Sequence, residues 1–145
     1  SEQARCLGVL GAAQVDRQGN LNSTRLSDGS FLMGSGGAND VASTAAEVIV
    51  VARQSRQRFV ERVSYVTSPG ARVTTVITQW GVYRKINDDL ILSAVLGDKS
   101  TIKEAREACG WDLQVAQDVA VLPFPNSAER EALHRFDPHG DLWCD

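Results

Sequence analysis

Two short apolar runs limit the fold of this chain more than any other feature of its sequence. Residues 6–15 (CLGVLGAAQV) and residues 48–52 (VIVVA) are apolar without alternating. A strand that is covered on both faces, as in a parallel sheet, carries apolar residues throughout. A strand with one solvent-exposed face alternates between apolar and polar residues. Both runs therefore predict strands that are buried on both faces.

Further strands are predicted after the second run. Residues 73–78 alternate and are rich in β-branched side chains, which indicates a strand. Residues 80–85 and 90–96 flank Asn87-Asp88-Asp89 and predict a hairpin. Residues 113–121 predict one more strand, whereas the polar stretch 21–32 indicates a loop.

Two short helices are predicted between these strands. Asn39 or Asp40 is suited to cap a helix over residues 41–46. Ser100 or Thr101 begins an amphipathic helix that reaches Cys109, and Thr101 with Glu104 matches the capping-box pattern.

A third helix is predicted near the end of the sequence. Asn126 or Ser127 caps it, and Asp137-Pro138 stops it, because the residue before proline disfavours helical dihedrals. Its apolar side chains share one face: Ala128, Ala132, Leu133 and Phe136.

Buried strands alternating with helices predict the α/β class, with an open, mainly parallel sheet and flanking helices. At 145 residues, the chain corresponds to about one domain, here taken as residues 1–145. Its net charge of −3 argues against a nucleic-acid or membrane-surface partner, and no apolar run is long enough to span a bilayer. These features predict a cytoplasmic protein.

The sequence predicts no metal site and no disulfide framework. Cys6, Cys109 and Cys144 are too scattered for either, and His134 and His139 lack neighbours at metal-ligand spacing. The three tryptophans are expected to pack in the core or at an interface: Trp80, Trp111 and Trp143.

A glycine-rich stretch before the first predicted helix is the sharpest local feature. It comprises Gly34, Ser35, Gly36, Gly37, Ala38 and Asn39. Free N–H groups of such a loop can bind a phosphate or the oxyanion that develops during acyl transfer. A flexible loop without a ligand is an equally good interpretation. The spacing matches neither the dinucleotide fingerprint nor a Walker loop.

Polar side chains also cluster just after the first apolar run. They are Gln14, Asp16, Asn20 and Asn22. Ligands of open α/β sheets lie at the carboxyl ends of the strands, so this cluster is a candidate substrate site. The alternative is a polar turn whose side chains bond their own backbone.

Charged side chains elsewhere are weaker candidates. Four arginines are suited to bind phosphates or a carboxylate, although an exposed basic edge or a subunit contact is the favoured interpretation: Arg53, Arg56, Arg58 and Arg62. Glu61 is expected to pair at the surface, and Glu47 to be a solvated acid at a helix end.

Three ordered motifs together resemble one family. They are GAAQVDxxGNxN from residue 11, GSGGAND from residue 34, and FVERVSYVTSPG from residue 59. In this order they resemble the later part of the B subunit of class I CoA-transferases, in the glutaconate CoA-transferase branch. The resemblance is dense over residues 5–85 and looser over residues 100–143.

The resemblance implies the CoA-transferase (NagB/RpiA-like) fold, present here as a partial domain. It also implies transfer of CoA from an acyl-CoA to a carboxylic acid through a glutamyl-CoA thioester, with no permanently bound cofactor. The expected partners are an A subunit and the N-terminal half of the B subunit. By position, Gly36, Gly37 and Ala38 take the role of the family's oxyanion loop, shaped by Gly34 and Ser35.

The nucleophilic glutamate of the family lies upstream of the strand with which this sequence opens. Glu2 is the only acid before that strand and matches no motif, so the nucleophile is expected outside this chain. The isolated chain is then expected to be inactive and to expose apolar surface that associates with a partner. The alternatives are an acyl-CoA hydrolase or decarboxylase on the same scaffold, and a non-catalytic CoA-binding module.

Overall fold

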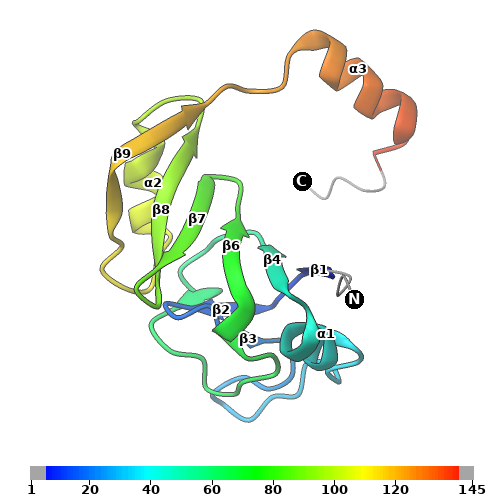
Figure 1. The fold of residues 1–145 in the computed structure, drawn as a ribbon, viewed down its shortest axis with the longest axis vertical. Helices are drawn as coiled ribbons and strands as arrows, with labels where there is room; N and C mark the ends of the chain where they lie inside the picture. Colours follow the sequence, from blue (N-terminus) through cyan, green and yellow to red (C-terminus); the bar gives the residue numbers. More distant parts are fainter. Residues whose placement is uncertain (1–5, 141–145) are drawn as a thin grey trace, which may run out of the picture.

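The computed structural model describes residues 6–140, and they form two β-sheets with short helices (Figure 1). The larger sheet consists of β1 (Leu7–Leu10), β4 (Glu47–Val51), β6 (Val73–Ile77), β7 (Gly81–Ile86), β8 (Asp89–Leu96) and β9 (Val115–Leu122), in that spatial order. The smaller sheet has the order β3 (Leu21–Asn22), β2 (Gln14–Asp16), β5 (Phe59–Val60). The helical elements are α1 (Ala38–Thr44), η1 (Gly70–Arg72), α2 (Thr101–Glu107) and α3 (Ser127–Phe136).

The larger sheet is mixed, with parallel pairing in the majority. β1 pairs with β4, β4 with β6, and β8 with β9 in parallel, whereas β7 runs antiparallel to both β6 and β8. Parallel neighbours need long connections, and the connection from β1 to β4 contains β2, β3 and α1. The predicted α/β class is confirmed.

The predicted hairpin is confirmed as β7 and β8. Its turn residues Asn87 and Asp88 have φ values of 51° and 67°. Positive φ at both central residues gives the turn whose twist matches that of the flanking strands, and Asn and Asp tolerate it better than other non-glycine residues. The strands predicted over residues 73–78 and 113–121 are confirmed as β6 and β9.

The prediction of one doubly buried strand over residues 6–15 is wrong. The run breaks into β1 and β2, which belong to different sheets. β1 is an edge strand, and Leu7 and Val9 are 53% and 62% exposed. Helix α1 covers the opposite face, where a Cβ on Gly8 would lie 2.6 Å from Val41. A continuous apolar run therefore does not distinguish a central strand from an edge strand with one open apolar face.

The sequence did not predict the smaller sheet, because its strands β3 and β5 have two residues each and therefore show no hydrophobic periodicity. Both nevertheless contribute to the core, since Leu21 and Phe59 are buried. The Phe59 ring packs against Tyr83 of the larger sheet at a centroid distance of 5.7 Å and stacks on Trp111 at 5.9 Å. Aromatic burial of this kind joins the two sheets into one core.

The predicted cap of the first helix is wrong, whereas the second helix starts as predicted, with Ser100 as its N-cap, but without the predicted capping box. The N-cap of α1 is Gly37, whose carbonyl oxygen accepts from the Val41 amide at 3.0 Å, and Asn39 lies inside the first turn. At α2, no capping box forms, because the Thr101 hydroxyl donates to the carbonyl oxygen of Leu96 at 2.9 Å.

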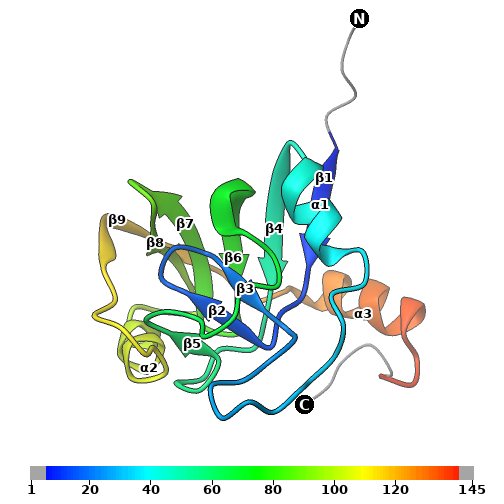
Figure 2. The same ribbon diagram turned by 90° about the horizontal axis from the view of Figure 1, so that it is seen from below.

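The start of α3 is as predicted. The Asn126 side chain accepts from the Glu129 amide at 3.0 Å, and the Glu129 carboxylate accepts from the Asn126 amide at 2.8 Å, which completes a capping box. No residue of this helix is buried, and Phe136 is 78% exposed. Figure 1 shows α3 at the end of an extended segment, set apart from both sheets. Figure 2 gives the perpendicular view of the same arrangement.

Two predicted packing residues are found as expected: Trp111 is buried and Trp80 is half-buried against the core. Trp143 and Cys144 lie outside the described residues. Cys109 is a buried free thiol, and its burial raises its pKa to about 11. Cys6 is a free, exposed thiol.

Candidate functional site

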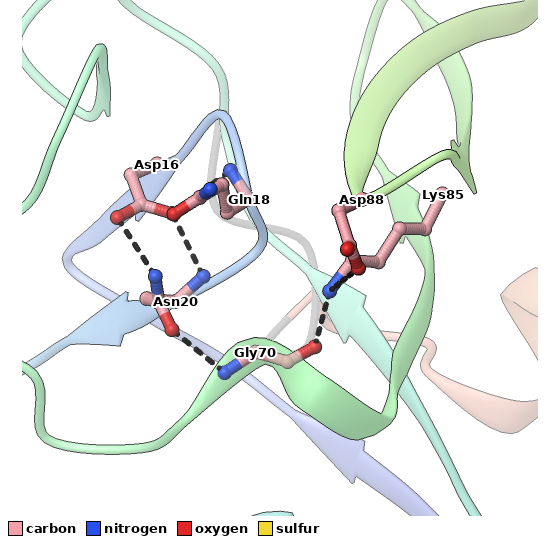
Figure 3. A network of polar contacts seen from close by, with 6 residues as sticks. All are labelled: Asp16, Gln18, Asn20, Gly70, Lys85 and Asp88. Atoms are coloured by element: carbon pink, nitrogen blue, oxygen red, sulfur yellow. Dashed lines mark hydrogen bonds and ion pairs between the residues drawn. The ribbon is translucent and has the colours of Figure 1, made fainter.

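The turn that follows β2 holds a buried carboxylate (Figure 3). Asp16 is 1% exposed. One of its oxygens accepts from the amides of Gln18 and Asn20 at 3.0 and 2.9 Å. The other accepts from Asn20 Nδ2 at 3.1 Å and from the Val63 amide at 3.4 Å. Four donors thus occupy this carboxylate, which organises the segment of residues 16–22, named here the Asp16 turn.

The Asp16 turn is tied to η1 and to β7. The Gly70 amide donates to Asn20 Oδ1 at 2.9 Å, and Lys85 Nζ donates to the Gly70 carbonyl oxygen at 3.0 Å (Figure 3). A Cβ at Gly70 would lie 2.5 Å from the carbonyl carbon of Gly19, so only glycine allows the two backbones to approach this closely.

The side-chain amide of Asn22 is likewise fully engaged in hydrogen bonds within the protein. Its Nδ2 donates to Gln14 Oε1 at 2.9 Å and to the Arg25 carbonyl oxygen at 2.7 Å. Its Oδ1 accepts from the amides of Thr24 and Arg25 at 3.0 and 3.2 Å. Among the predicted substrate-site residues, Asp16, Asn20 and Asn22 therefore act as framework within this chain. Gln14 differs, because it lines a cavity of about 440 Å³ together with Arg58.

The glycine loop, residues 34–37, is open on every side. A Cβ placed on Gly34, Gly36 or Gly37 would meet no atom within 4 Å. Gly36 has φ +51°, and Gly37 follows with φ −86° and ψ 0°. Within residues 6–140, the amide groups of Gly36 and Gly37 donate no hydrogen bond. A left-handed residue next to one near the right-handed helical region directs successive N–H groups to one side, which is the geometry of an anion-binding nest.

The four candidate arginines, Arg53, Arg56, Arg58 and Arg62, are all exposed, as the sequence predicted. Their surroundings differ, because Arg58 lines the cavity beside Gln14, whereas Arg62 lines a second hollow of about 500 Å³ on the outside of the Asp16 turn.

The predicted surface pairing of Glu61 is confirmed, with Arg17 as partner at 3.6 Å. Arg17 also binds Asp89 at 2.6 Å, and this hydrogen bond raises the pKa of the guanidinium. The prediction for Glu47 is wrong: it opens β4, is half-buried, and accepts a hydrogen bond from the Thr74 hydroxyl.

Metal ligands do not gather in the part of the chain that the structure describes, where no group of three His, Cys, Asp or Glu side chains is placed to hold an ion. Among residues 6–140, no helix is both long and apolar enough to cross a membrane.

Comparison with known proteins identifies the family. The model of the coenzyme A transferase family matches residues 2–105, so the chain belongs to that family, as its motifs indicated. It is 30% identical, over 90% of its length, to the B subunit of 3-oxoadipate CoA-transferase from Pseudomonas knackmussii, of which it covers 58%.

Solved structures agree with this placement. Glutaconate coenzyme A-transferase from Acidaminococcus fermentans superposes on 98% of this chain with a TM-score of 0.85 at 25% identity, and 62% of its own chain is covered. A variant of the decarboxylase AibA/AibB superposes on 94% of this chain with a TM-score of 0.79 at 27% identity, and 59% of it is covered. The chain thus spans about three fifths of the length of these relatives.

Sequence inspection did not find the cavity beside Gln14. Its walls come from three separate segments, around residues 13–14, 26–32 and 57–58. The available signal was topological: two of these segments follow the carboxyl ends of the parallel strands β1 and β4, where ligands of open α/β sheets bind.

Proposed function

We propose that this protein is a B-subunit component of a CoA-transferase, which moves CoA from an acyl-CoA to a carboxylic acid. The observation that carries the proposal is the open nest at Gly36 and Gly37, which lies in the motif position of the family's oxyanion loop. The two transferases to which the chain is similar, 3-oxoadipate and glutaconate CoA-transferase, support the same reaction class.

The proposed reaction makes an oxyanion at each acyl-transfer step. A carboxylate attacks the thioester carbonyl, and the carbonyl oxygen gains negative charge before the carbon–sulfur bond breaks. Donors held in advance at the position of that oxygen stabilise the transition state more than the ground state. Among residues 6–140, the amides of Gly36 and Gly37 have no hydrogen-bond partner to give up, so they can donate without rearrangement. The amide of Ala38, which the resemblance assigns to the same oxyanion loop, donates to the Ser35 carbonyl oxygen at 3.1 Å, so in this structure it closes the turn at the end of the nest.

The proposed nucleophile is a glutamate outside residues 1–145, in keeping with the family pattern. Two carboxylates of this chain support this proposal, one within the first motif and one seven residues after the second. Asp16 is buried under four donors, and Glu47 is engaged by Thr74. A carboxylate held by several donors is a poor nucleophile, because those hydrogen bonds stabilise the charge that it would have to share.

The proposed partners are an A subunit and the N-terminal part of the B subunit. The exposed apolar side chains on the edge strand β1 support this, because Leu7 and Val9 lie next to each other on one face with Val51 of β4, which is 53% exposed. Contiguous apolar surface of this kind marks an interface.

A covalent trap tests the proposal. The purified protein with its partner polypeptides is incubated with an acyl-CoA, and intact mass shows which polypeptide gains CoA. We expect the adduct on a partner and none on residues 1–145. An adduct on this chain would overturn the placement of the nucleophile. Absence of an adduct on any polypeptide, together with absence of transfer, would overturn the transferase function.

The similarity to the decarboxylase AibA/AibB favours a second candidate, a decarboxylase on the same scaffold. Product analysis separates the candidates, including the hydrolase. Transfer requires an added carboxylic acid and conserves the thioester, hydrolysis consumes the thioester without an acceptor, and decarboxylation releases CO₂. Calorimetric binding of CoA without any turnover would instead indicate a CoA-binding module.

A further inference from the structure

The segment between β3 and α1 leads into the glycine loop, and it has little packing of its own. Figure 2 shows it as a long loop outside the two sheets. None of the residues 23–41 is buried. A Cβ on Gly34, Gly36 or Gly37 would meet no atom within 4 Å, so neighbouring segments give the glycine loop little lateral support. The position of the glycine loop therefore depends on what fixes its two ends.

The end at α1 is fixed by packing. Ala42 of α1 is 1% exposed, and Val41 packs partly buried against the core. The Gly37 carbonyl oxygen accepts from the Val41 amide at 3.0 Å, which joins the glycine loop to this helix.

The other end is a short hairpin formed by residues 24–32, which contains an antiparallel bridge. Its two arms are joined where the Leu32 amide donates to the Thr24 carbonyl oxygen at 2.7 Å. Leu32 precedes Gly34 by two residues, which span at most about 7 Å. A shift of Thr24 therefore displaces the start of the glycine loop as well.

Thr67 ties the base of this hairpin to the smaller sheet. Its side chain is buried, and its hydroxyl accepts from the Ser23 amide at 2.9 Å and donates to the Thr24 hydroxyl oxygen at 2.9 Å. The backbone of Thr67 is itself held by β3, because its amide donates to the Leu21 carbonyl oxygen at 2.8 Å. One buried hydroxyl thus links β3 to the hairpin that carries the glycine loop.

These hydrogen bonds connect the three sequence motifs, which are far apart in the chain. Leu21 belongs to the first motif and Thr67 to the third, and the hairpin that Thr67 holds ends two residues before the second motif. The proposed reaction gives no other role to the third motif.

We propose that Thr67 is a positioning residue for CoA transfer, whose hydroxyl holds the 24–32 hairpin so that the amides of Gly36 and Gly37 are directed at the oxyanion. The inference rests on the proposed function of the glycine loop. Donors stabilise a transition state only when they are held in place, and a misplacement of about 1 Å can cost about 100-fold in rate. Loss of the Thr67 hydroxyl should therefore slow the chemical step without weakening the binding of acyl-CoA.

Thr67→Val removes the hydroxyl and keeps the shape of the side chain. In the complete enzyme with its partner polypeptides, we expect kcat for CoA transfer to fall about 10- to 100-fold, while the KM for acyl-CoA changes less than about twofold. Thr67→Ser keeps the hydroxyl and should restore most of kcat. Steady-state kinetics with a saturating carboxylic acid acceptor measures both constants.

Thr78→Val is the matched control. Thr78 and Thr67 are both 6% exposed. The Thr78 hydroxyl accepts from the Trp80 amide at 3.1 Å and donates to Gln54 Oε1 at 3.3 Å, and its partners all lie within residues 54–81. Both variants should lower the midpoint of thermal unfolding, but only Thr67→Val should lower kcat.

Hydrogen–deuterium exchange of the same enzyme gives a readout that does not require turnover. Two amides next to the glycine loop report on its anchoring: that of Leu32, and that of Ala38, which donates to the Ser35 carbonyl oxygen at 3.1 Å. In Thr67→Val both should exchange faster, while the amides of β7 and β8 keep their protection. Unchanged exchange at Leu32 and Ala38 would overturn the positioning role.

The outcomes separate this inference from the proposed function. A fall in kcat no larger than that of Thr78→Val would overturn the inference and leave the transferase function intact. Absence of CoA transfer by the parent enzyme would overturn the function, and exchange at Leu32 and Ala38 would then decide whether Thr67 holds the glycine loop. If Thr67→Val does not fold, Thr24→Val tests the same hydrogen bond from a half-buried position, and unchanged kcat and exchange in that variant would overturn the inference.

Discussion

The Asp16 turn follows β2 and the glycine loop precedes α1; both are rich in polar residues or glycine, but their hydrogen-bonding groups differ in opposite ways. In the Asp16 turn, Asp16 is 1% exposed and Asn22 is buried, with every strong donor or acceptor of their side chains engaged. In the glycine loop all four residues are exposed, and the amides of Gly36 and Gly37 have no partner among residues 6–140.

The difference shows how a ligand site can be told from a framework of similar composition. A polar group whose hydrogen bonds are satisfied inside the protein gains little from a ligand and loses much when mutated. A group left open contributes little to stability and is available for binding. We therefore expect mutations in the Asp16 turn to act on stability, and mutations in the glycine loop to act on turnover.

The largest expected effect on stability is that of Asp16→Ala. The substitution leaves buried N–H donors without an acceptor, so we expect unfolding to become easier by about 3–5 kcal/mol. Urea denaturation measures this loss. Asp118→Ala, an exposed position on β9, is the control and should change stability by less than about 0.5 kcal/mol. A loss below about 1 kcal/mol for Asp16→Ala would contradict the framework role.

Gly37→Val should reverse this pattern. A Cβ at this position meets no atom within 4 Å, so stability should change by less than about 1 kcal/mol, while turnover of the complete enzyme falls about 100- to 1,000-fold. Steady-state transfer rates and thermal unfolding of the same samples measure both. Gly70→Ala is the matched control in the Asp16 turn network, because its Cβ would overlap the Gly19 backbone and destabilise the fold. Unchanged turnover in Gly37→Val would refute the oxyanion role.

The core next to the Asp16 turn should also weaken at high pH. Strand β2, which leads into the Asp16 turn, pairs with β5, and the carbonyl oxygen of Phe59 in β5 accepts from the amide of Gly110, next to Cys109. The pKa of Cys109 is raised from 9.0 to about 11, so the folded state keeps a proton that the unfolded state loses. Stability is then complete below pH 9 and declines up to about pH 11, by at most about 2–3 kcal/mol.

Cys109→Ala isolates this effect, because it removes the thiol and should flatten the decline between pH 9 and 11. Burial raises the pKa of Tyr83 as well, so some decline above pH 10 should remain in the variant. An identical pH profile for the variant and the parent protein, measured by urea denaturation, would show that Cys109 is not the cause.

The smallest expected effect is that of Gly36→Ala. Its φ of +51° costs an alanine about 1 kcal/mol, and no clash adds to that cost. Thermal unfolding measures the loss, with Gly34→Ala as the unstrained control. A loss of several kcal/mol would show that the glycine loop is more tightly packed than its open contacts indicate.

Sequence-based prediction succeeded where the residues that cause a structure lie within a few positions of one another in the chain. The hairpin around Asn87 and Asp88 was predictable because these residue types accept positive φ. The capping box at Asn126 was predictable because its two hydrogen bonds join residues three positions apart. The family and the α/β class were predictable from ordered motifs and apolar strands.

Prediction failed where the outcome depends on distant residues. The two-residue strand β5 carries Phe59, whose ring packs against Tyr83 and Trp111, residues that are distant in the sequence. Arg58 could not be separated from Arg56 in the sequence, because only the folded chain places one of them at the cavity beside Gln14. The exposure of Leu7 and Val9 depends on the position of β1 at the sheet edge.

By itself, the sequence determined the family, the α/β class and the position of the glycine loop, because each depends on residues that are close along the chain. The tertiary structure decided which polar groups form the framework and which can bind a ligand. It buries the side chains of Asp16 and Asn22, and it leaves the amides of Gly36 and Gly37 and the side chain of Arg58 exposed. The physical reason is that hydrogen-bond satisfaction and burial depend on partners far away in sequence, such as Val63 and Gly70.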